Sequence, residues 1–199
     1  GKMMNFGIKV DKQAGSGAYK LTLVSESITP WENDLVSHDA TAKEYIVINS
    51  TPGGLKNAIT AANKDYTQVR NLKITGQIDA RDFYFMRDSM TRLSALNLKE
   101  VRIKAWGRQQ IENNPNEDDQ IPGSSFYWNS SVSGSQSLTR IVLPDTLRSI
   151  GPNAFYGCKY LSGSLLIPEG VVEIQRGAFN GCTGLNGTLS LHSPRSEER

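Results

Sequence analysis

One stretch of the chain repeats itself, and this repeat constrains the fold more than any other feature. Residues 141–163 read IVLPDTLRSIGPNAFYGCKYLSG, and residues 165–187 read LLIPEGVVEIQRGAFNGCTGLNG. The copies align without a gap at a constant 24-residue offset, and a third copy begins at Leu189. A unit this short cannot bury its apolar residues alone, because its core needs a neighbour on each side. The repeat therefore predicts stacked units that share one continuous core.

Weaker copies precede the clear ones. The segment from Ile121 to Phe126 keeps the isoleucine-to-phenylalanine spacing of Ile150 to Phe155, and a Ser/Gly-rich insertion at 130–135 follows it. Further upstream, Leu72-Lys-Ile74 recurs at the same offset as Leu96-Asn-Leu98. Between them, residues 79–88 begin with an acidic residue and then space Phe83 and Met86 three apart, which predicts a helix.

Each unit reads as a short strand followed by turns. In residues 141–143 the two flanking residues are expected to point inward and the middle residue outward, because side chains alternate along a strand. Gly157 and Gly181 occupy the same repeat position, where we expect a positive φ or no room for a Cβ. The strands of successive units then form a parallel sheet.

The pattern L-x-x-I-x-L-P-x-x-L-x-x-I-G-x-x-A-F-x-x-C-x-x-L, carried by residues 138–192, resembles the BspA-like leucine-rich repeats. Residues 53–104 are similar to the irregular segment that precedes such repeats in Bacteroides proteins. The resemblance implies a surface or secreted protein, often held by a lipid anchor, that acts in adhesion or protein recognition. This chain has about two clear copies, fewer than many members of the family.

Residues 1–50 lack the repeat and predict a small β region. Phe6, Ile8 and Val10 alternate, as do Tyr19, Leu21 and Leu23, which favours a hairpin, and residues 45–48 predict a third strand. Thr51-Pro52 predicts the start of a helix whose apolar face holds Leu55, Ile59 and Ala62, and this helix would cap the array.

The predicted fold class is therefore α+β. It comprises a short leucine-rich-repeat solenoid of parallel strands with period 24, a helical N-terminal cap and a small N-terminal β region. The predicted domains are 1–50 and 51–199. The second divides into a cap with degenerate repeats at 51–104, an irregular repeat at 105–137 and clear repeats at 138–192.

Composition narrows the function. The chain has 22 basic and 20 acidic residues, which leaves a net charge of +2 with both signs interspersed, and this argues against a nucleic-acid partner. No apolar run approaches the roughly 20 residues of a membrane-spanning helix. No signal peptide precedes Met3, but Gly1 is typical of the residue that a cleaved tag leaves, so this indicates nothing about the compartment.

No group of residues predicts catalysis, a cofactor or a metal. His38 and His192 lie in segments without a partner pattern for a nucleophile and base, and His192 takes the repeat position of Pro144 and Pro168. The acidic stretch 112–119 does not follow the spacing of a calcium loop. We therefore expect a protein that is not an enzyme.

Cys158 and Cys182 lie one repeat apart. Adjacent strands would place their Cα atoms about 5 Å apart, a separation that permits a disulfide. Parallel side chains on a ladder seldom reach the required dihedral angle, so we favour two buried thiols that fill the same core position.

The expected function is non-enzymatic binding or adhesion by an exported protein at the cell surface, in the periplasm or secreted. The partner is expected to be a host or bacterial surface protein. One alternative is a glycan-binding accessory protein of a polysaccharide-uptake system, for which Trp31, Trp106, Tyr127 and Trp128 would form an aromatic platform. Another is a structural spacer.

The outward residues of the clear repeats form the expected partner-binding face. Val142 and Leu166 would be exposed apolar neighbours on it, and Lys73 and Asn97 would continue the row upstream. The predicted face consists of Arg140, Val142, Ser164, Leu166, Thr188 and Ser190.

Overall fold

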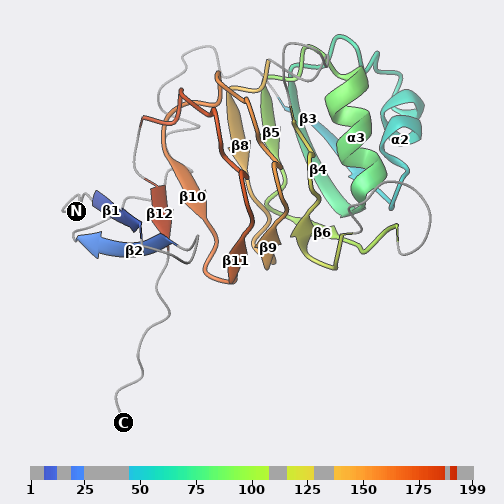
Figure 1. The fold of residues 1–199 in the computed structure, drawn as a ribbon. Coiled ribbons are helices and arrows are strands. Elements are labelled where there is room, and N and C mark those ends of the chain that lie inside the picture. The colour runs from blue at the N-terminus through green and yellow to red at the C-terminus, as the bar shows by residue number, and fades with distance from the viewer. Residues whose placement is uncertain are drawn as a thin grey trace, which may run out of the picture.

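The computed structural model describes residues 45–107, 116–127 and 137–186 in full, and the backbone of residues 7–12, 19–24 and 189–191. Its largest sheet is parallel and has the strand order β3-β4-β5-β8, with β6 also paired to β4 (Figure 1). These strands are β3 (Ile46–Ser50), β4 (Asn71–Ile78), β5 (Ala95–Asn97), β6 (Val101–Ile103) and β8 (Arg140–Val142). Strand β3, expected beside the N-terminal hairpin, thus pairs with the strand that precedes helix α3.

Two further parallel ladders accompany this sheet. Strands β7 (Gln120–Ile121), β9 (Ser149–Ile150) and β11 (Glu173–Ile174) form a three-stranded ladder, and β10 (Leu165–Ile167) pairs with β12 (Leu189–Leu191). The register of β10 and β12 joins Leu165 to Leu189, and β9 and β11 join Ile150 to Ile174. Both pairs keep the 24-residue offset of the sequence repeat, as do Leu72 and Leu96 in β4 and β5.

The weak copy around Ile121 also aligns as the sequence predicts. Ile121 lies beside Ile150 in the β7–β9 ladder, and the rings of Phe126 and Phe155 stack with centroids 5.5 Å apart. The expected insertion at 130–135 lies outside the described residues.

Two helices lie on one flank of the main sheet (Figure 1). Helix α3 (Ala80–Ser89) follows the prediction, with Asp79 as its N-cap and Phe83 and Met86 buried. Helix α2 (Leu55–Ala61) starts later than predicted, because Thr51 to Gly54 form a turn in which Gly53 has a φ of 72°. Leu55 and Ile59 are buried as predicted. Ala62 is exposed, since the helix has already ended there.

The core is a continuous cluster of buried residues from the main sheet, the two ladders and both helices. A row of rings runs through it: Phe83 meets Phe126 edge-on at 6.0 Å, and Phe126, Phe155 and Phe179 stack in succession. One ring per repeat therefore fills the space between the ladders, and each ring packs on those of its neighbours.

Equivalent turn positions adopt the same backbone conformation. Gly157 and Gly181 have φ angles of 75° and 77°, which confirms the predicted positive φ. A second position is held in the left-handed region by Ser124, Asn153 and Gly177 in three successive units. Asparagine and glycine tolerate this region better than most residues, which explains their use here.

The predicted N-terminal hairpin is present. Strands β1 (Gly7–Lys12) and β2 (Tyr19–Val24) pair antiparallel, with Val10 opposite Leu21. Strand β1 lies against β12, at the end of the repeats remote from helix α2 (Figure 1).

Candidate partner-binding face

One residue from each of four successive strands forms a row across the main sheet. The registers place Val47, Lys73, Asn97 and Val142 side by side on successive strands. Leu166 and Ser190 are paired in the same way in the β10–β12 ladder. The sequence predicted this arrangement for Lys73, Asn97 and Val142, because the flanking residues of the same strands face the core.

The predicted residues differ in how much surface they offer. Arg140 and Ser164 are exposed, Leu166 is half-buried and Val142 is buried. For Ser190 the structure gives only its backbone pairing with Leu166. Thr188 lies outside the described residues.

The expected exposure of Val142 is wrong, since only 8% of this residue remains accessible. Strand β8 has β5 on one side and β10 close to the other. A short β-branched side chain between two neighbouring strands keeps little surface of its own. Among the described residues, Val142 does not join the continuous core cluster, which agrees with a side chain on the outer side of the sheet.

Exposed apolar surface on this row lies instead at Val47, which keeps 60% of its surface and which the sequence did not assign to the row. The 24-residue offset would match Val47 with Asn71, whereas the register pairs it with Lys73, so the offset misses it. Beside it, the Lys73 ammonium pairs with the carboxylate of Glu100 at 2.5 Å. The upstream half of the face is thus both apolar and charged.

Arg140 shares its end of the face with an aromatic residue. Tyr45 directly precedes β3, and it is half-buried. Burial raises the pKa of the Tyr45 phenol, and the positive charge of Arg140 opposes that rise. A phenol and a guanidinium therefore lie within electrostatic reach of each other where the strands begin.

Two of the four aromatic residues of the glycan alternative, Trp106 and Tyr127, lie within the described residues. Trp106 is half-buried, with the Arg81 guanidinium 5.5 Å from its ring centre. Tyr127 stacks on Tyr156 at 5.0 Å between ring centres. Trp31 and Trp128 lie outside the described residues, so the platform stays a prediction.

A polar hollow lies beside the three-stranded ladder, and the sequence did not indicate it. Its lining supplies carboxylates, amides and a hydroxyl, from Glu117, Gln120, Ser149, Glu173 and Gln175, with Gly123 and Pro152 beside them. Gln120, Ser149 and Glu173 are register partners in the ladder, so the strand pairing itself aligns three of these groups.

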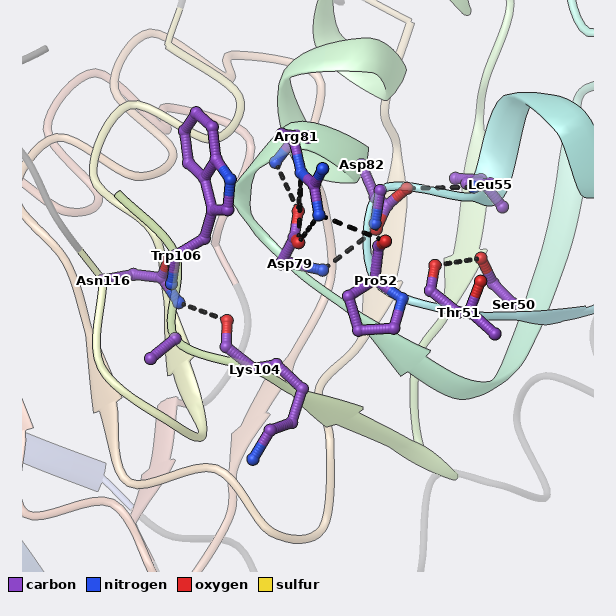
Figure 2. A network of polar contacts seen from close by, with 12 residues as sticks. Ser50, Thr51, Pro52, Leu55, Asp79, Arg81, Asp82, Lys104, Trp106 and Asn116 are labelled. Atoms are coloured by element: carbon purple, nitrogen blue, oxygen red, sulfur yellow. Dashed lines mark hydrogen bonds and ion pairs between the residues drawn. The ribbon is translucent and has the colours of Figure 1, made fainter. Parts of the chain in front are cut away.

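A buried carboxylate joins the two helices (Figure 2). Asp82 accepts hydrogen bonds from the backbone N–H groups of Gly53 at 2.8 Å, Leu55 at 3.0 Å and Asp79 at 2.9 Å. Burial raises the pKa of the Asp82 carboxyl, and these three bonds oppose the rise. Because the bonds satisfy N–H groups at the starts of both helices, Asp82 is a structural link between them.

Arg81 extends this network to the surface. Its guanidinium pairs with the buried Asp79 carboxylate at 2.5 Å and lies beside Trp106 (Figure 2). The Asn116 side chain holds the segment that follows β6 by donating to the carbonyl oxygen of Lys104 at 2.9 Å. These contacts fix the helical end of the sheet.

Both cysteines are free thiols buried in the core, as predicted. The Cys158 Sγ donates to the carbonyl oxygen of Phe126 at 3.2 Å, and the Cys182 Sγ donates to that of Phe155 at 3.0 Å. Burial raises the pKa of Cys158 to about 12 and that of Cys182 to about 11. Such thiols are poor nucleophiles, since the reactive species is the thiolate.

Neither a metal centre nor a membrane-spanning helix emerges from the part of the chain that the structure describes. No three His, Cys, Asp or Glu side chains there are grouped so that they could hold a metal ion. The described helices are too short and too polar to cross a bilayer.

The parallel ladders pair residues that lie 24 positions apart in the sequence, and each unit adds one stacked phenylalanine ring to the core. These are features of leucine-rich-repeat proteins. Residues 119–193 match the family model described as BspA type leucine rich repeat region (6 copies), the family that the sequence pattern resembles. Repeat regions of this type are generally non-enzymatic, typically mediate protein interactions and are common on surface or secreted proteins. A comparison with curated proteins gave no match.

Proposed function

We propose that this chain is a non-enzymatic binding protein of the cell surface, the periplasm or the extracellular space. Its repeats stack as a solenoid with period 24, capped by helix α2. The outer side of the parallel sheet recognises an extended segment of a protein partner, either a host protein or a bacterial surface protein. The family of residues 119–193 supports a role in protein interaction.

The observation that carries this proposal is the row of outward residues on consecutive strands. Val47 offers an apolar contact, Lys73 a charge and Asn97 an amide, one per strand. Parallel strands space such groups about 4.8 Å apart, which suits a partner that crosses the strands in an extended form. Arg140, Ser164 and Leu166 continue this face, and Thr188 and Ser190 complete it in the proposal.

A comparison of glutamate substitutions on and off the face tests it. Surface proteins of host cells and of bacteria are presented separately to the immobilised chain, and the affinity of any protein that is retained is then measured for variants. Lys73→Glu reverses a charge on the face and Ser164→Glu introduces one. Each should weaken binding about tenfold or more if its position is among the central residues that carry most of the binding energy. Lys56→Glu, on the exposed side of helix α2, makes the same charge change as Lys73→Glu away from the face and should leave binding intact. Equal affinity of all variants would place the site elsewhere.

The polar hollow favours a second candidate function, the binding of a glycan. Sugar hydroxyls both donate and accept hydrogen bonds. The hollow offers carboxylates, which accept, and side-chain amides, which donate and accept. A glycan array probed with the chain and with Glu173→Gln plus Gln175→Ala would test this candidate. Binding that these changes abolish, and Lys73→Glu leaves unchanged, supports the glycan function over the protein function. A chain that retains neither proteins nor glycans would favour the structural spacer.

A further inference from the structure

Strand pairing builds the floor of the polar hollow, which has a volume of about 200 Å³. Gln120, Ser149 and Glu173 are register partners on β7, β9 and β11, of which β9 and β11 are seen side by side in Figure 1. Their chain neighbours Ile121 and Ile150 are fully buried in the core. Because side chains alternate along a strand, the three register partners face the outer side of the ladder. Serine is the shortest of the three, so it forms a floor between two longer side chains.

The floor carries polar groups that the fold holds but does not satisfy. Ser149 keeps only 8% of its surface, and its hydroxyl has no hydrogen-bond partner among the described residues. No fully enclosed side-chain N or O atom of these residues lacks a partner, so the Ser149 hydroxyl must open into the hollow that it lines. Gln120 is equally buried, and its side-chain oxygen accepts from the N–H of Glu117 at 3.1 Å, which leaves its NH₂ group for a ligand. Unsatisfied groups at this depth indicate a binding site.

Two carboxylates, those of Glu117 and Glu173, stand at the rim of this floor and are exposed. The Gln175 side-chain amide donates to one Glu173 oxygen at 3.1 Å, which leaves the other oxygen and the amide carbonyl as acceptors. None of the residues that line the hollow, all of them within the described part of the chain, is basic. Carboxylates only accept hydrogen bonds, so the hollow offers more acceptors than donors and a negative charge without a cation. Its ligand must be rich in donors and positively charged.

The size of the hollow and its acceptors select the ligand. Its volume is below the roughly 300 to 1,000 Å³ of sites for small organic molecules, so it suits a single side chain. A guanidinium has five N–H donors in a planar fork and no acceptor, whereas an ammonium is a strongly hydrated point charge. A neutral sugar brings acceptors as well as donors and no charge to pair with the carboxylates. We propose that the polar hollow binds the arginine side chain of a protein partner, an inference that rests on the proposed role in protein recognition.

Titration of the ¹⁵N-labelled 199-residue chain with Nα-acetylarginine amide tests this site by NMR. The backbone amide signals of Gln120 and Ser149 should shift, with a dissociation constant on the order of 1 to 10 mM, since ion pairs at an exposed rim are weak. Nα-acetylcitrulline amide has nearly the same shape without the charge and should produce no shift. Nα-acetyl-lysine amide should bind about threefold more weakly or less, because it lacks the planar fork.

Three variants separate charge from position. Glu117→Gln/Glu173→Gln removes both carboxylates and should raise the dissociation constant about tenfold or more. Ser149→Ala keeps the charge, removes the hydroxyl on the floor and should raise the constant about threefold. Glu100→Gln removes an exposed carboxylate beside the main sheet and should leave the constant unchanged. The dispersion of each variant's spectrum shows that the chain is folded.

Three results would overturn the arginine site. They are no shift of the Gln120 and Ser149 signals up to about 50 mM probe, equal binding of the citrulline or lysine probe, and an unchanged constant in the double glutamine variant. A shift caused by N-acetylglucosamine and not by the arginine probe would overturn it in favour of the glycan candidate. The probe needs no partner protein, so its failure removes this site alone, whereas the glutamate substitutions on the partner-binding face decide the proposed protein recognition there.

Discussion

The rings of Phe155 and Phe179 lie parallel, with an interplanar angle of 1° and centroids 5.2 Å apart. They occupy the same position in two successive repeats, yet Phe155 is fully buried and Phe179 is only partly covered. One repeat position thus has two environments, and the difference follows from whether a further unit packs on the ring.

This difference predicts unequal costs for the same substitution. Phe155→Ala removes a ring that is packed on both faces and should cost about 3 to 5 kcal/mol of unfolding free energy. Phe179→Ala removes a ring with one packed face and should cost about half as much. Urea unfolding followed by circular dichroism measures both. Equal losses would indicate that the ring of Phe179 is covered on both faces in solution.

The buried thiols predict a loss of stability at alkaline pH. Burial raises the pKa of Cys158 to about 12 and that of Cys182 to about 11, from an ordinary value of 9.0. Between pH 9 and pH 11 the unfolded chain releases the thiol protons and the folded chain keeps them. The contribution of the thiols to the free energy of unfolding is therefore fully present below pH 9 and is lost as the pH rises. The decline should reach about 1 kcal/mol per thiol by pH 10.

The measurement is urea unfolding from pH 8 to pH 10 on the original chain and on Cys158→Ala/Cys182→Ala. The variant should be less stable at pH 8 and should show a shallower decline, because it has lost the two titrating groups. A thiol reagent at pH 8 should find two groups in denaturant and almost none in the native chain. Parallel pH profiles for the two proteins would contradict the assignment.

Asp82 predicts a large effect from a residue far from the proposed binding face. Asp82→Ala leaves three backbone N–H groups without their acceptor, those of Gly53, Leu55 and Asp79. A buried donor without a partner costs about 1 to 3 kcal/mol, so the total should be about 3 kcal/mol or more. Asp88→Ala, at the exposed end of the same helix, should cost less than about 0.5 kcal/mol. Thermal unfolding compares them, and similar melting temperatures would argue against the helix link.

The repeat could be predicted from the sequence because equivalent positions in each unit have the same environment and carry the same types of residue. The 24-residue offset predicted that Leu72 and Leu96 share a row. At Gly157 and Gly181 the repeat predicted a positive φ or no room for a Cβ, and the φ angles are positive. The burial of Val142 was not readable, since alternation gives the side to which a side chain points and not what lies beside it. Val47 was missed because its register with Lys73 departs from the repeat offset.

The hydrogen bonds that the N–H groups of Gly53 and Leu55 donate to Asp82 were missed for a different reason. They join residues 29 and 27 positions apart, and only the packing of the two helices brings them together. Sequence indicated an acidic helix start at this place but could not show that one carboxylate serves two helices. The polar hollow likewise depends on how strands β7, β9 and β11 stack, which aligns Gln120, Ser149 and Glu173.

At Gly177, in a left-handed turn, the cost of backbone strain can be separated from the cost of a side-chain clash. Gly177 has a φ of 70°, and a Cβ added there would meet the Asn153 side-chain oxygen of the preceding repeat. Gly163 has a φ of 80°, and nothing lies within 4 Å of the position its Cβ would take. Gly163→Ala should therefore cost only the backbone strain, about 1 to 2 kcal/mol. Gly177→Ala should cost more, because the new methyl group also displaces Asn153.

A double-mutant cycle separates the two contributions at Gly177. Asn153→Ala removes the side chain that the new methyl group would meet, so Gly177→Ala in that background should cost no more than Gly163→Ala. Guanidinium unfolding of the four proteins in the cycle, with Gly163→Ala as the reference, gives the coupling free energy. Its expected sign is favourable, with the double variant more stable than the sum of the single losses allows. A coupling of zero would show that Asn153 moves aside freely and that strain in the backbone is the whole cost.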